Sequence, residues 1–471
     1  MTNRSLMRLR RRSRLLLLAM LLVVLGPNPA MAESLQPPTQ VDTALSIETT
    51  TPVKHLVTIM QSNHTYDSLF GAYPGGDGVP SGVCLSPDPD MPSKNDCVAP
   101  FVLENNGADF DHSHNTFVNQ YRDGRNDGFI YSFRRRGEDG TLAMGHYTES
   151  DIPFSYNVAD QYVLFDRFFT SASAGSVPNR MYWMTGTPGI TSFEHATIPK
   201  DGWGDLPTIF DELQKKGVSW KLYVENYDPA INFRNRGVGG TYAQVNWAPL
   251  LTFSRFVDNP ELAQHIVNLD QYFVDVENNQ LPAVSYVVTI GSSGHPPSSL
   301  LASERMLKDM VSSLMMSPAW DTSVIQWAYD DWGGWYDHVP PPQVDEYGYG
   351  FRTAAQLVSP YARQGYIDAE THDFTSILRF IEDNWSVPSL ATRDQNATSI
   401  ATALDFNQAP RAPQLLSMSR DTTSLAIPNR TGIHISYSIA ILSAGLIIAT
   451  SFFSRHGRRV ARKIGRKGRR S

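Results

Sequence analysis

The feature that most constrains the fold is a series of short, apolar, β-branched runs accompanied by helix-like segments. The runs are His55–Met60, Ser219–Val224, Ala283–Val288, Val324–Ala328 and Ala355–Val358. The helical patterns include Thr208–Lys216, Leu301–Met315 and Thr375–Asn384. Such runs are typical of strands that are buried on both faces of a sheet. They predict an α/β fold with a doubly wound, mainly parallel sheet, in which the functional site lies beyond the carboxyl ends of the strands.

The N-terminal 32 residues have the pattern of a secretory signal peptide. Five arginines between residues 8 and 14 precede the apolar run Leu15–Leu25, and the small residues Ala30 and Ala32 form a cleavage site. The arginines loosely match a twin-arginine export signal. An uncleaved anchor is the alternative, although the run is short for a membrane span. Residues 33–52 are rich in Pro, Thr and Ser, and we expect a flexible lead-in there.

The C-terminal end predicts a membrane anchor. Ile433–Phe453 contains no Asp, Glu, Lys or Arg, and a helix of this length spans about 30 Å, the thickness of a bilayer core. The basic tail at 454–471 marks the cytoplasmic side. We therefore predict a single-pass protein of the cell membrane, with a catalytic domain at 53–395 outside the cytoplasm and a stalk at 396–432. A buried core helix followed by a basic tail is the alternative.

The charge of the body argues against nucleic acid as a partner. The formal net charge is −7, but fifteen of the 40 basic residues lie in the two ends, which contain no acid. The body between them has 25 basic and 47 acidic residues, a net charge of −22. Nucleic-acid binding depends on Lys and Arg that neutralise phosphates. Such a body fits an exported domain, and one whose site needs a cation.

Cys84 and Cys97 are the two cysteines of the chain and lie thirteen positions apart. In an exported protein this spacing predicts one disulfide, which would close a loop rich in Pro and Asp. Two free thiols are the alternative.

Oxygen and nitrogen ligands gather after two of the predicted strands. Gln61–Asp67 follows the first, and Asp330–His338 follows the fourth. Neighbouring buried carboxylates are costly unless they are protonated or share a cation. Oxygen ligands suit Ca²⁺, Mg²⁺ or Mn²⁺, and histidine admits Zn²⁺ or Fe. The alternative for Asp330 and Asp331 is a solvated turn before Gly333.

A candidate nucleophile lies in Gly175–Arg180. Ser176 follows a glycine just before a predicted helix, where backbone N–H groups favour an anion such as phosphate. Arg180 could donate to phosphate oxygens. The alternative is that Ser176 is a plain helix N-cap. His112 and His295 are candidate proton donors to a leaving alkoxide, although a lone histidine is more often structural.

Taken together, these segments resemble the bacterial phosphoesterase family that contains phospholipases C and an acid phosphatase, within the alkaline phosphatase-like superfamily. The resemblance covers Val53–Trp385, and Tyr329–Pro342 is its most specific stretch. The motifs are Ile59–Gln61, Asp67, Phe70–Gly75, Asp111–His114, Asn126–Phe129, Pro178–Arg180, Met184–Thr187, Pro207–Asp211, His295–Pro297, Tyr329–Pro342, Val358–Ala362 and Thr375–Leu378.

The resemblance implies a phosphoryl-enzyme mechanism in which Ser176 is the nucleophile. It also implies one divalent metal ion of unspecified identity. The implied metal-site residues are Asn63, Asp330 and Asp331, with His338 near the site, and His112 or His295 would protonate the leaving group. The family usually has Glu where this chain has Ser62, and an acid where it has Gly294. His64 is a hypothetical replacement ligand.

The leading functional prediction is a phospholipase C-like hydrolase that acts on a phospholipid at the outer membrane face, because a tether raises the local substrate concentration. One alternative is an acid phosphatase that acts on soluble phosphomonoesters. Another is a surface binding protein that has lost catalysis, which the change at Ser62 favours. A formylglycine sulfatase is disfavoured because no cysteine occupies the nucleophile position.

Overall fold

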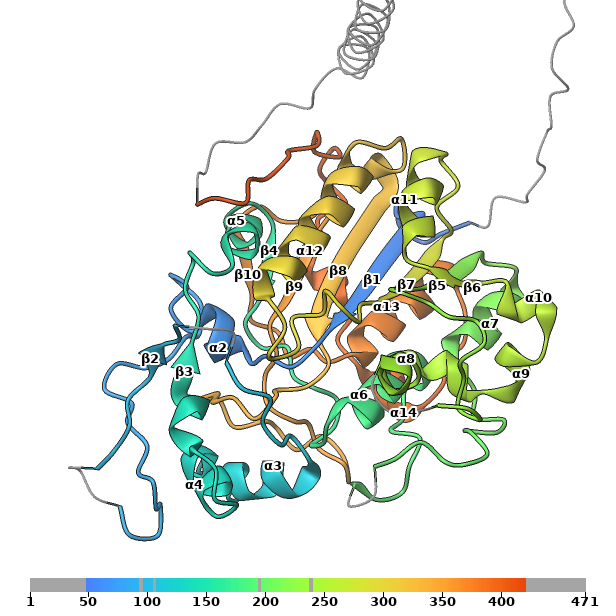
Figure 1. Cartoon of the computed structure of the whole chain (residues 1–471). Helices are drawn as coiled ribbons and strands as arrows, with labels where there is room; N and C mark the ends of the chain where they lie inside the picture. Colours follow the sequence, from blue (N-terminus) through green and yellow to red (C-terminus); the bar gives the residue numbers. More distant parts are fainter. Residues whose placement is uncertain (1–47, 93–95, 105–106, 194–195, 237–239, 421–471) are drawn as a thin grey trace, which may run out of the picture. The chain divides into compact units, whose positions relative to one another are not determined.

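The predicted sheet forms the centre of the fold in a computed structural model that describes residues 48–92, 96–104, 107–193, 196–236 and 240–420 (Figure 1). Its strand order is β10-β4-β9-β8-β1-β7-β5-β6. The strands are β1 His55–Gln61, β4 Val163–Phe165, β5 Trp220–Val224, β6 Ile266–Asn268, β7 Val284–Val288, β8 Ser323–Tyr329, β9 Ala355–Val358 and β10 Tyr366–Asp368. β9 runs antiparallel to β4 and β8, and the other described strands are parallel, so the sheet is mixed and mostly parallel.

Helices cover both faces of the sheet because its buried strands are apolar on both sides. Thr58 on β1 and Tyr286 on β7 are paired in register and face Trp183, whose indole N–H donates to the Thr58 hydroxyl. Tyr223 on β5 points the other way and contacts Tyr272. Figure 1 shows the two helical layers. They are α5 Pro153–Gln161, α11 Asp270–Glu277 and α12 Leu300–Met315, and α6 Ser176–Thr185, α7 Ile209–Lys216 and α13 Thr375–Trp385.

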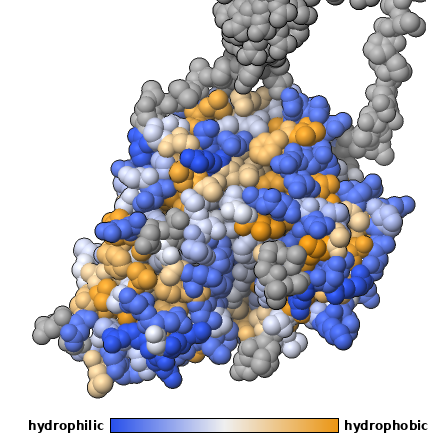
Figure 2. Space-filling view, in the orientation of Figure 1, coloured by the Kyte–Doolittle hydropathy of each residue, from blue (hydrophilic) through white to orange (hydrophobic). Residues whose placement is uncertain are grey.

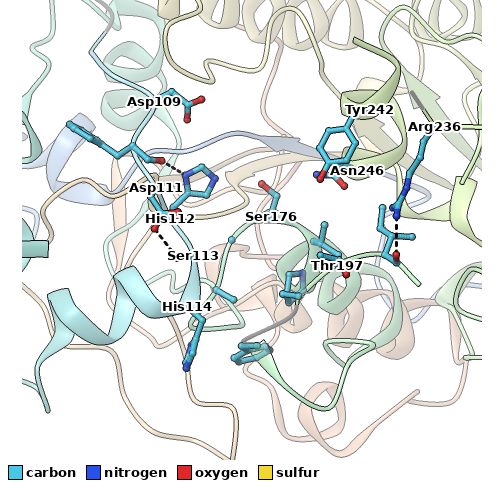
Figure 3. A pocket seen from close by; sticks show the side chains of 18 residues that line it. Asp109, Asp111, His112, Ser113, His114, Ser176, Thr197, Arg236, Tyr242 and Asn246 are labelled. Carbon is cyan, nitrogen blue, oxygen red and sulfur yellow. Dashed lines mark hydrogen bonds between the residues drawn. The ribbon is translucent and has the colours of Figure 1, made fainter. Parts of the chain in front are cut away.

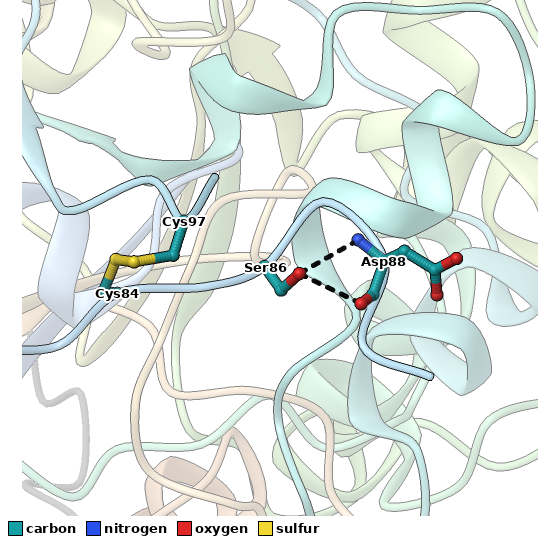
Figure 4. The surroundings of a disulfide bond; sticks show 4 residues. All are labelled: Cys84, Ser86, Asp88 and Cys97. Carbon is teal, nitrogen blue, oxygen red and sulfur yellow. Dashed lines mark hydrogen bonds between the residues drawn. A yellow bond between two sulfur atoms is a disulfide. The ribbon is translucent and has the colours of Figure 1, made fainter. Parts of the chain in front are cut away.

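A smaller hydrophobic cluster lies beside the sheet, centred on Trp332 and Trp335. It includes residues of α2 Tyr66–Phe70, α3 His114–Tyr121 and α4 Phe129–Arg134, and residues that flank β2 Phe101–Val102 and β3 Gly145–His146. The remaining helices are α8 Gly240–Trp247, α9 Ser254–Val257, α10 Pro260–Ala263 and α14 Thr392–Asn396. In the adjoining loop Cys84 and Cys97 form a disulfide (Figure 4). Figure 2 shows hydrophilic side chains spread over the surface with apolar ones between them, as expected for a domain with an internal core.

The predicted signal peptide, membrane helix and basic tail lie outside the described residues, as do most of the lead-in and part of the stalk. Within the described part of the chain, no helix is long and apolar enough to span a membrane. Residues 396–420, which we predicted as the start of a stalk, pack against the domain instead. The Arg411 backbone N–H donates to the carbonyl of Pro360, and Leu404 and Leu416 are buried.

Candidate active site

The site is built where two neighbouring parallel strands end. Gln61 of β1 lies beside Tyr329 of β8, and the Asp330 backbone N–H donates to the Gln61 carbonyl at 3.1 Å. The residues that follow these strands therefore leave the sheet side by side. They bring Ser62 against Asp330 and Asn63 against Gly333 in the turn that follows Asp331. Asn63, Asp330 and Asp331 are all buried. This is the rim position that the sequence predicted.

A tight turn holds Asp331 in place. The Gly333 backbone N–H donates to Asp331 Oδ1 at 2.8 Å. Gly333 has φ +62°, and a Cβ there would lie 2.6 Å from the Asn63 carbonyl oxygen, so the turn requires glycine. Asn63 itself has φ 74°, a conformation that asparagine tolerates better than most residues. Asp331 is thus part of a fixed turn and not of a solvated one.

Ser176 lies at the start of α6 and faces Asp331. Its hydroxyl donates to Asp331 Oδ2 at 3.1 Å. Gly175 is the N-cap, so Ser176 is the first helical residue and does not cap the helix. Asn179 fixes the preceding loop, because its amide accepts from the Ala172 N–H at 2.8 Å and donates to the Ala174 carbonyl at 2.7 Å. The helix start presents the hydroxyl to the pocket, as Figure 3 shows.

Arg180 contacts Asp330 in a way that the sequence did not predict. Its guanidinium is fully buried and donates to Asp330 Oδ2 at 2.7 Å, to the Ser62 hydroxyl at 3.0 Å and to the carbonyls of Gln61 and Trp247. With these donors engaged, Arg180 positions Asp330, and its contact with phosphate stays a prediction. The Ser62 hydroxyl also donates to Asp330 Oδ2, at 3.2 Å.

The two predicted histidines lie near each other, with ring centroids 6.3 Å apart. His112 Nδ1 lies 2.7 Å from the Phe110 carbonyl, so it carries the proton, and Nε2 lies 3.8 Å from Asp331 Oδ2. His295 bonds its own Nδ1 to the Pro296 carbonyl at 2.7 Å and packs against Trp247. His112 Nε2 also lies 3.3 Å from the Asn63 amide nitrogen, and His295 Nε2 lies 3.9 Å from Asp109 Oδ1.

The electrostatics favour proton transfer in this cluster. Burial raises the pKa of Asp331, and the nearby charge of Asp330 adds to the rise, while His112 opposes it. Burial also disfavours the charged form of His112, but the charge of Asp331 and the Phe110 carbonyl outweigh it and raise the pKa of His112. Asp331, a more basic carboxylate beside the Ser176 hydroxyl, suits a general base. His112, a more readily charged imidazole, suits a general acid.

The oxygen atoms fit a hard divalent cation. Asn63 Oδ1 and Asp330 Oδ1 are buried and lack a hydrogen-bond donor among the described residues. Unsatisfied buried acceptors are costly, and a cation would satisfy them. Together with Asp331 and Ser176 they form the set that would hold a metal ion.

Two other predicted ligands lie elsewhere. His338 bonds through Nδ1 to Asp67 Oδ2 at 2.8 Å and groups with Asp67 and Asp337, not with Asp330 and Asp331. The reason is the turn after β8, which carries the chain away from the rim before His338. The hypothesis for His64 is also wrong, because its Nε2 faces the Gly294 carbonyl at 3.0 Å and its ring lies among Tyr147, Tyr329 and Trp335. Burial there lowers the pKa of His64 to about 3.

Ser176 opens into a pocket of about 590 Å³. One wall carries Asp109, Asp111 and His112, and the facing wall carries Arg236, Tyr242 and Asn246 (Figure 3). Sequence reasoning missed the facing wall, because it comes from loops and α8 and contains no motif. Asp109 Oδ1 lies 3.9 Å from His295 Nε2, a contact that sequence spacing does not reveal.

Comparison with known proteins identifies the family. The model of the Phosphoesterase family matches residues 53–388, most of the chain. The chain belongs to the Phosphoesterase family. The predicted resemblance is thereby confirmed, and so is the prediction of a hydrolase that acts on phosphoester bonds.

Several phospholipases C are similar to most of this chain. Phospholipase C B of Mycobacterium tuberculosis is 28% identical, and the alignment covers 76% of this chain and 79% of that protein. Non-specific phospholipase C3 of Arabidopsis thaliana is 23% identical, with coverage of 75% and 72%. Among solved structures, an alkaline phosphatase superfamily protein from Vibrio parahaemolyticus matches at a TM-score of 0.33 with 12% identity, covering 70% of this chain and 66% of that one.

Proposed function

We propose that the chain is a phospholipase C-type phosphodiesterase that works through a phosphoryl-Ser176 intermediate. The observation that carries this proposal is the hydrogen bond from the Ser176 hydroxyl to the buried Asp331 carboxylate, at the floor of an open pocket. The names of the relatives support a phospholipid as the substrate. The pocket volume of about 590 Å³ leaves room for a substituted phosphodiester.

In the first half of the reaction, Asp331 takes the proton of the Ser176 hydroxyl as Oγ attacks phosphorus. The Oγ–P bond forms and the bond between phosphorus and the diacylglycerol oxygen breaks. His112 gives its Nε2 proton to that oxygen. His112 is better placed than His295 for this step because it lines the pocket with Ser176 and its pKa is raised.

In the second half, water replaces the serine. Neutral His112 accepts a proton from the water as the water oxygen bonds to phosphorus. The Oγ–P bond breaks, and Asp331 returns the proton to Ser176 Oγ. The phosphorylated head group leaves, and every group is back in its starting state.

Asn63, Asp330, Asp331 and Ser176 would hold a divalent cation. When bound, such an ion stabilises negative charge on the phosphoryl oxygens and lowers the pKa of a serine hydroxyl. Arg180 keeps one oxygen of Asp330 engaged, and its other oxygen, Oδ1, has no donor among the described residues.

The proposed setting is the outer face of the cell membrane. Two observations support it: the sequence patterns at both ends of the chain, and the Cys84–Cys97 disulfide, a bond typical of exported proteins. A predicted anchor at 433–453 would keep the pocket near lipid.

The test is hydrolysis by the full chain of p-nitrophenyl phosphorylcholine, a diester, and p-nitrophenyl phosphate, a monoester, with and without added Mn²⁺ or Ca²⁺. Ser176→Ala is measured beside wild type, with Ser173→Ala as the matched control. We expect cation-dependent release from the diester, reduced on the order of 10³-fold or more in Ser176→Ala. Preference for the monoester would instead make the chain a phosphatase. No release with either ester from a folded chain would support the binding-protein alternative.

A further inference from the structure

A second pocket adjoins the catalytic pocket. Its volume is about 740 Å³, and its lining includes Ile198, Lys200 and Arg236. Ile198 and Arg236 line the catalytic pocket as well. A group that extends from a phosphorus atom near Ser176 along this wall therefore reaches the second pocket.

Three basic residues line the second pocket: Lys200, Arg234 and Arg236. Arg234 is paired with Asp258 through two hydrogen bonds of 2.8 and 2.7 Å. Lys200 and Arg236 form no ion pair within the described part of the chain, and Asp201 is the acid among the lining residues. The pocket thus has a positive balance once the Arg234–Asp258 pair is set aside. This is notable because the body of the chain has a net charge of −22.

Arg236 is held in place for binding. Its Nη2 donates to the Ile198 carbonyl at 3.1 Å, and no other hydrogen bond of its side chain is made among the described residues. A guanidinium has five N–H donors, so most of them stay available. Figure 3 shows Arg236 across the pocket from Asp109 and His112, with Ser176 between the two walls. An anion bound at Arg236 would therefore lie on the side away from the proton donor.

We propose that Lys200 and Arg236 form a subsite for a second anionic group of the substrate. This inference rests on the proposed function and names the substrate class: phosphodiesters whose head group carries a carboxylate or a further phosphate. The leaving alcohol lies towards His112, and the head group, which stays on phosphorus, lies towards Arg236. A guanidinium and an ammonium bind carboxylates and phosphates by charge-assisted hydrogen bonds.

The test compares two lipids that differ by one carboxylate. Short-chain phosphatidylserine and phosphatidylethanolamine are supplied as monomers below their micelle concentration, so that the anion belongs to the substrate and not to a neighbouring lipid. We expect the full chain to have a kcat/KM about tenfold or more higher for the serine lipid, as charge-assisted hydrogen bonds imply. Arg236→Gln brings the ratio close to one, and Lys200→Gln lowers it about threefold.

Lys215→Gln is the control. Lys215 is an exposed cation on α7 that pairs with Glu212 at 2.7 Å, and its loss should leave the ratio unchanged. A wild-type ratio near one, or a ratio that survives in both Arg236→Gln and Lys200→Gln, would overturn the subsite while the phosphodiesterase stands. Absence of hydrolysis of both lipids would overturn the proposed function itself. Inhibition of wild type by free O-phosphoserine, weakened in Arg236→Gln, gives a second readout that does not depend on turnover of either lipid.

Discussion

Two acidic clusters follow β1 and β8, and they differ in how their carboxylates are satisfied. In the Ser176 cluster, Asp330 Oδ1 and Asn63 Oδ1 have no donor among the described residues. In the second cluster, formed by Asp67, Asp337 and His338, all four carboxylate oxygens accept hydrogen bonds.

A buried arginine explains the difference. Arg352 donates to Asp337 Oδ1 at 2.9 Å and to Asp67 Oδ1 at 3.0 Å, and it is fully buried. The ligand atoms of this second cluster lie within 4.8 Å of one another, close enough to suit a metal ion. Arg352, however, already supplies the positive charge that balances these carboxylates. Proximity of acids therefore does not identify a cation site; unsatisfied oxygens do. We therefore propose that the second cluster holds the loops together and that the Ser176 cluster carries the chemistry.

The largest expected effect is on activity in the Ser176 cluster. Asp331→Asn should lower kcat on the order of 10³-fold, because the amide does not accept the Ser176 proton. Its unfolding free energy should not fall, because burial already raises the pKa of this carboxyl and a neutral side chain suits the site. Steady-state kinetics and urea unfolding measure the two quantities. A variant that unfolds easily but keeps its kcat would reverse the roles of the two clusters.

The next effect is on stability in the second cluster. Arg352→Met leaves two buried carboxylates without their cation and should lower the unfolding free energy by ~3–5 kcal/mol. Arg379→Met removes an exposed pair with Asp383 and should cost at most ~0.5 kcal/mol. Urea unfolding in the absence of added metal compares the two. If Ca²⁺ or Mn²⁺ restored Arg352→Met to wild-type stability, the second cluster would be able to act as a metal site.

Metal affinity should distinguish the clusters more finely. Asn63→Gly removes the amide oxygen and still tolerates the positive φ, so we expect the dissociation constant for Mn²⁺ to rise about tenfold. His338→Asn should leave that constant unchanged. Calorimetric titration of each full-length variant provides the measurement. Weaker binding in His338→Asn alone would move the metal to the second cluster.

The smallest effect is a pH dependence of stability. Burial opposes the charge of His338, but Asp67 outweighs it and raises the pKa of His338 above the ordinary 6.5. Its contribution to stability is therefore complete below pH 6.5 and is lost as the pH rises through the folded-state pKa. His338→Asn should remove this decline. Burial lowers the pKa of His265, so this residue makes the unfolding free energy fall as the pH drops below 6.5. His265→Asn should reduce that fall.

Five strands of the sheet, β1, β5, β7, β8 and β9, could be predicted from the sequence, and the structure shows why the rest could not. The apolar sequence pattern of a strand that is buried on both faces does not depend on the strand's direction. The antiparallel orientation of β9 could therefore not be predicted. β4, β6 and β10 have three residues each, too few for a pattern. The positions of Asn63, Asp330 and Asp331 followed from the rule that sites lie beyond strand ends.

Contacts between distant segments were beyond sequence reasoning. Arg180 was predicted to bind phosphate, yet it pairs with Asp330, 150 positions later. His338 lies in the same motif, Tyr329–Pro342, as Asp331, but the intervening turn places it against Asp67, 271 positions earlier. Neither outcome depends on residue type or spacing; both depend on how loops from separate strands meet.

The most direct test of the account is identification of the covalent intermediate. The full chain is mixed with p-nitrophenyl phosphorylcholine, quenched in acid during turnover, digested and analysed by mass spectrometry. The account predicts a phosphorylcholine group on the peptide that contains Ser176, and none on that peptide in Ser176→Ala. A phosphorylcholine group on another residue would contradict it. Turnover without any covalent intermediate, under conditions in which hydrolysis of that intermediate should limit the rate, would also contradict it.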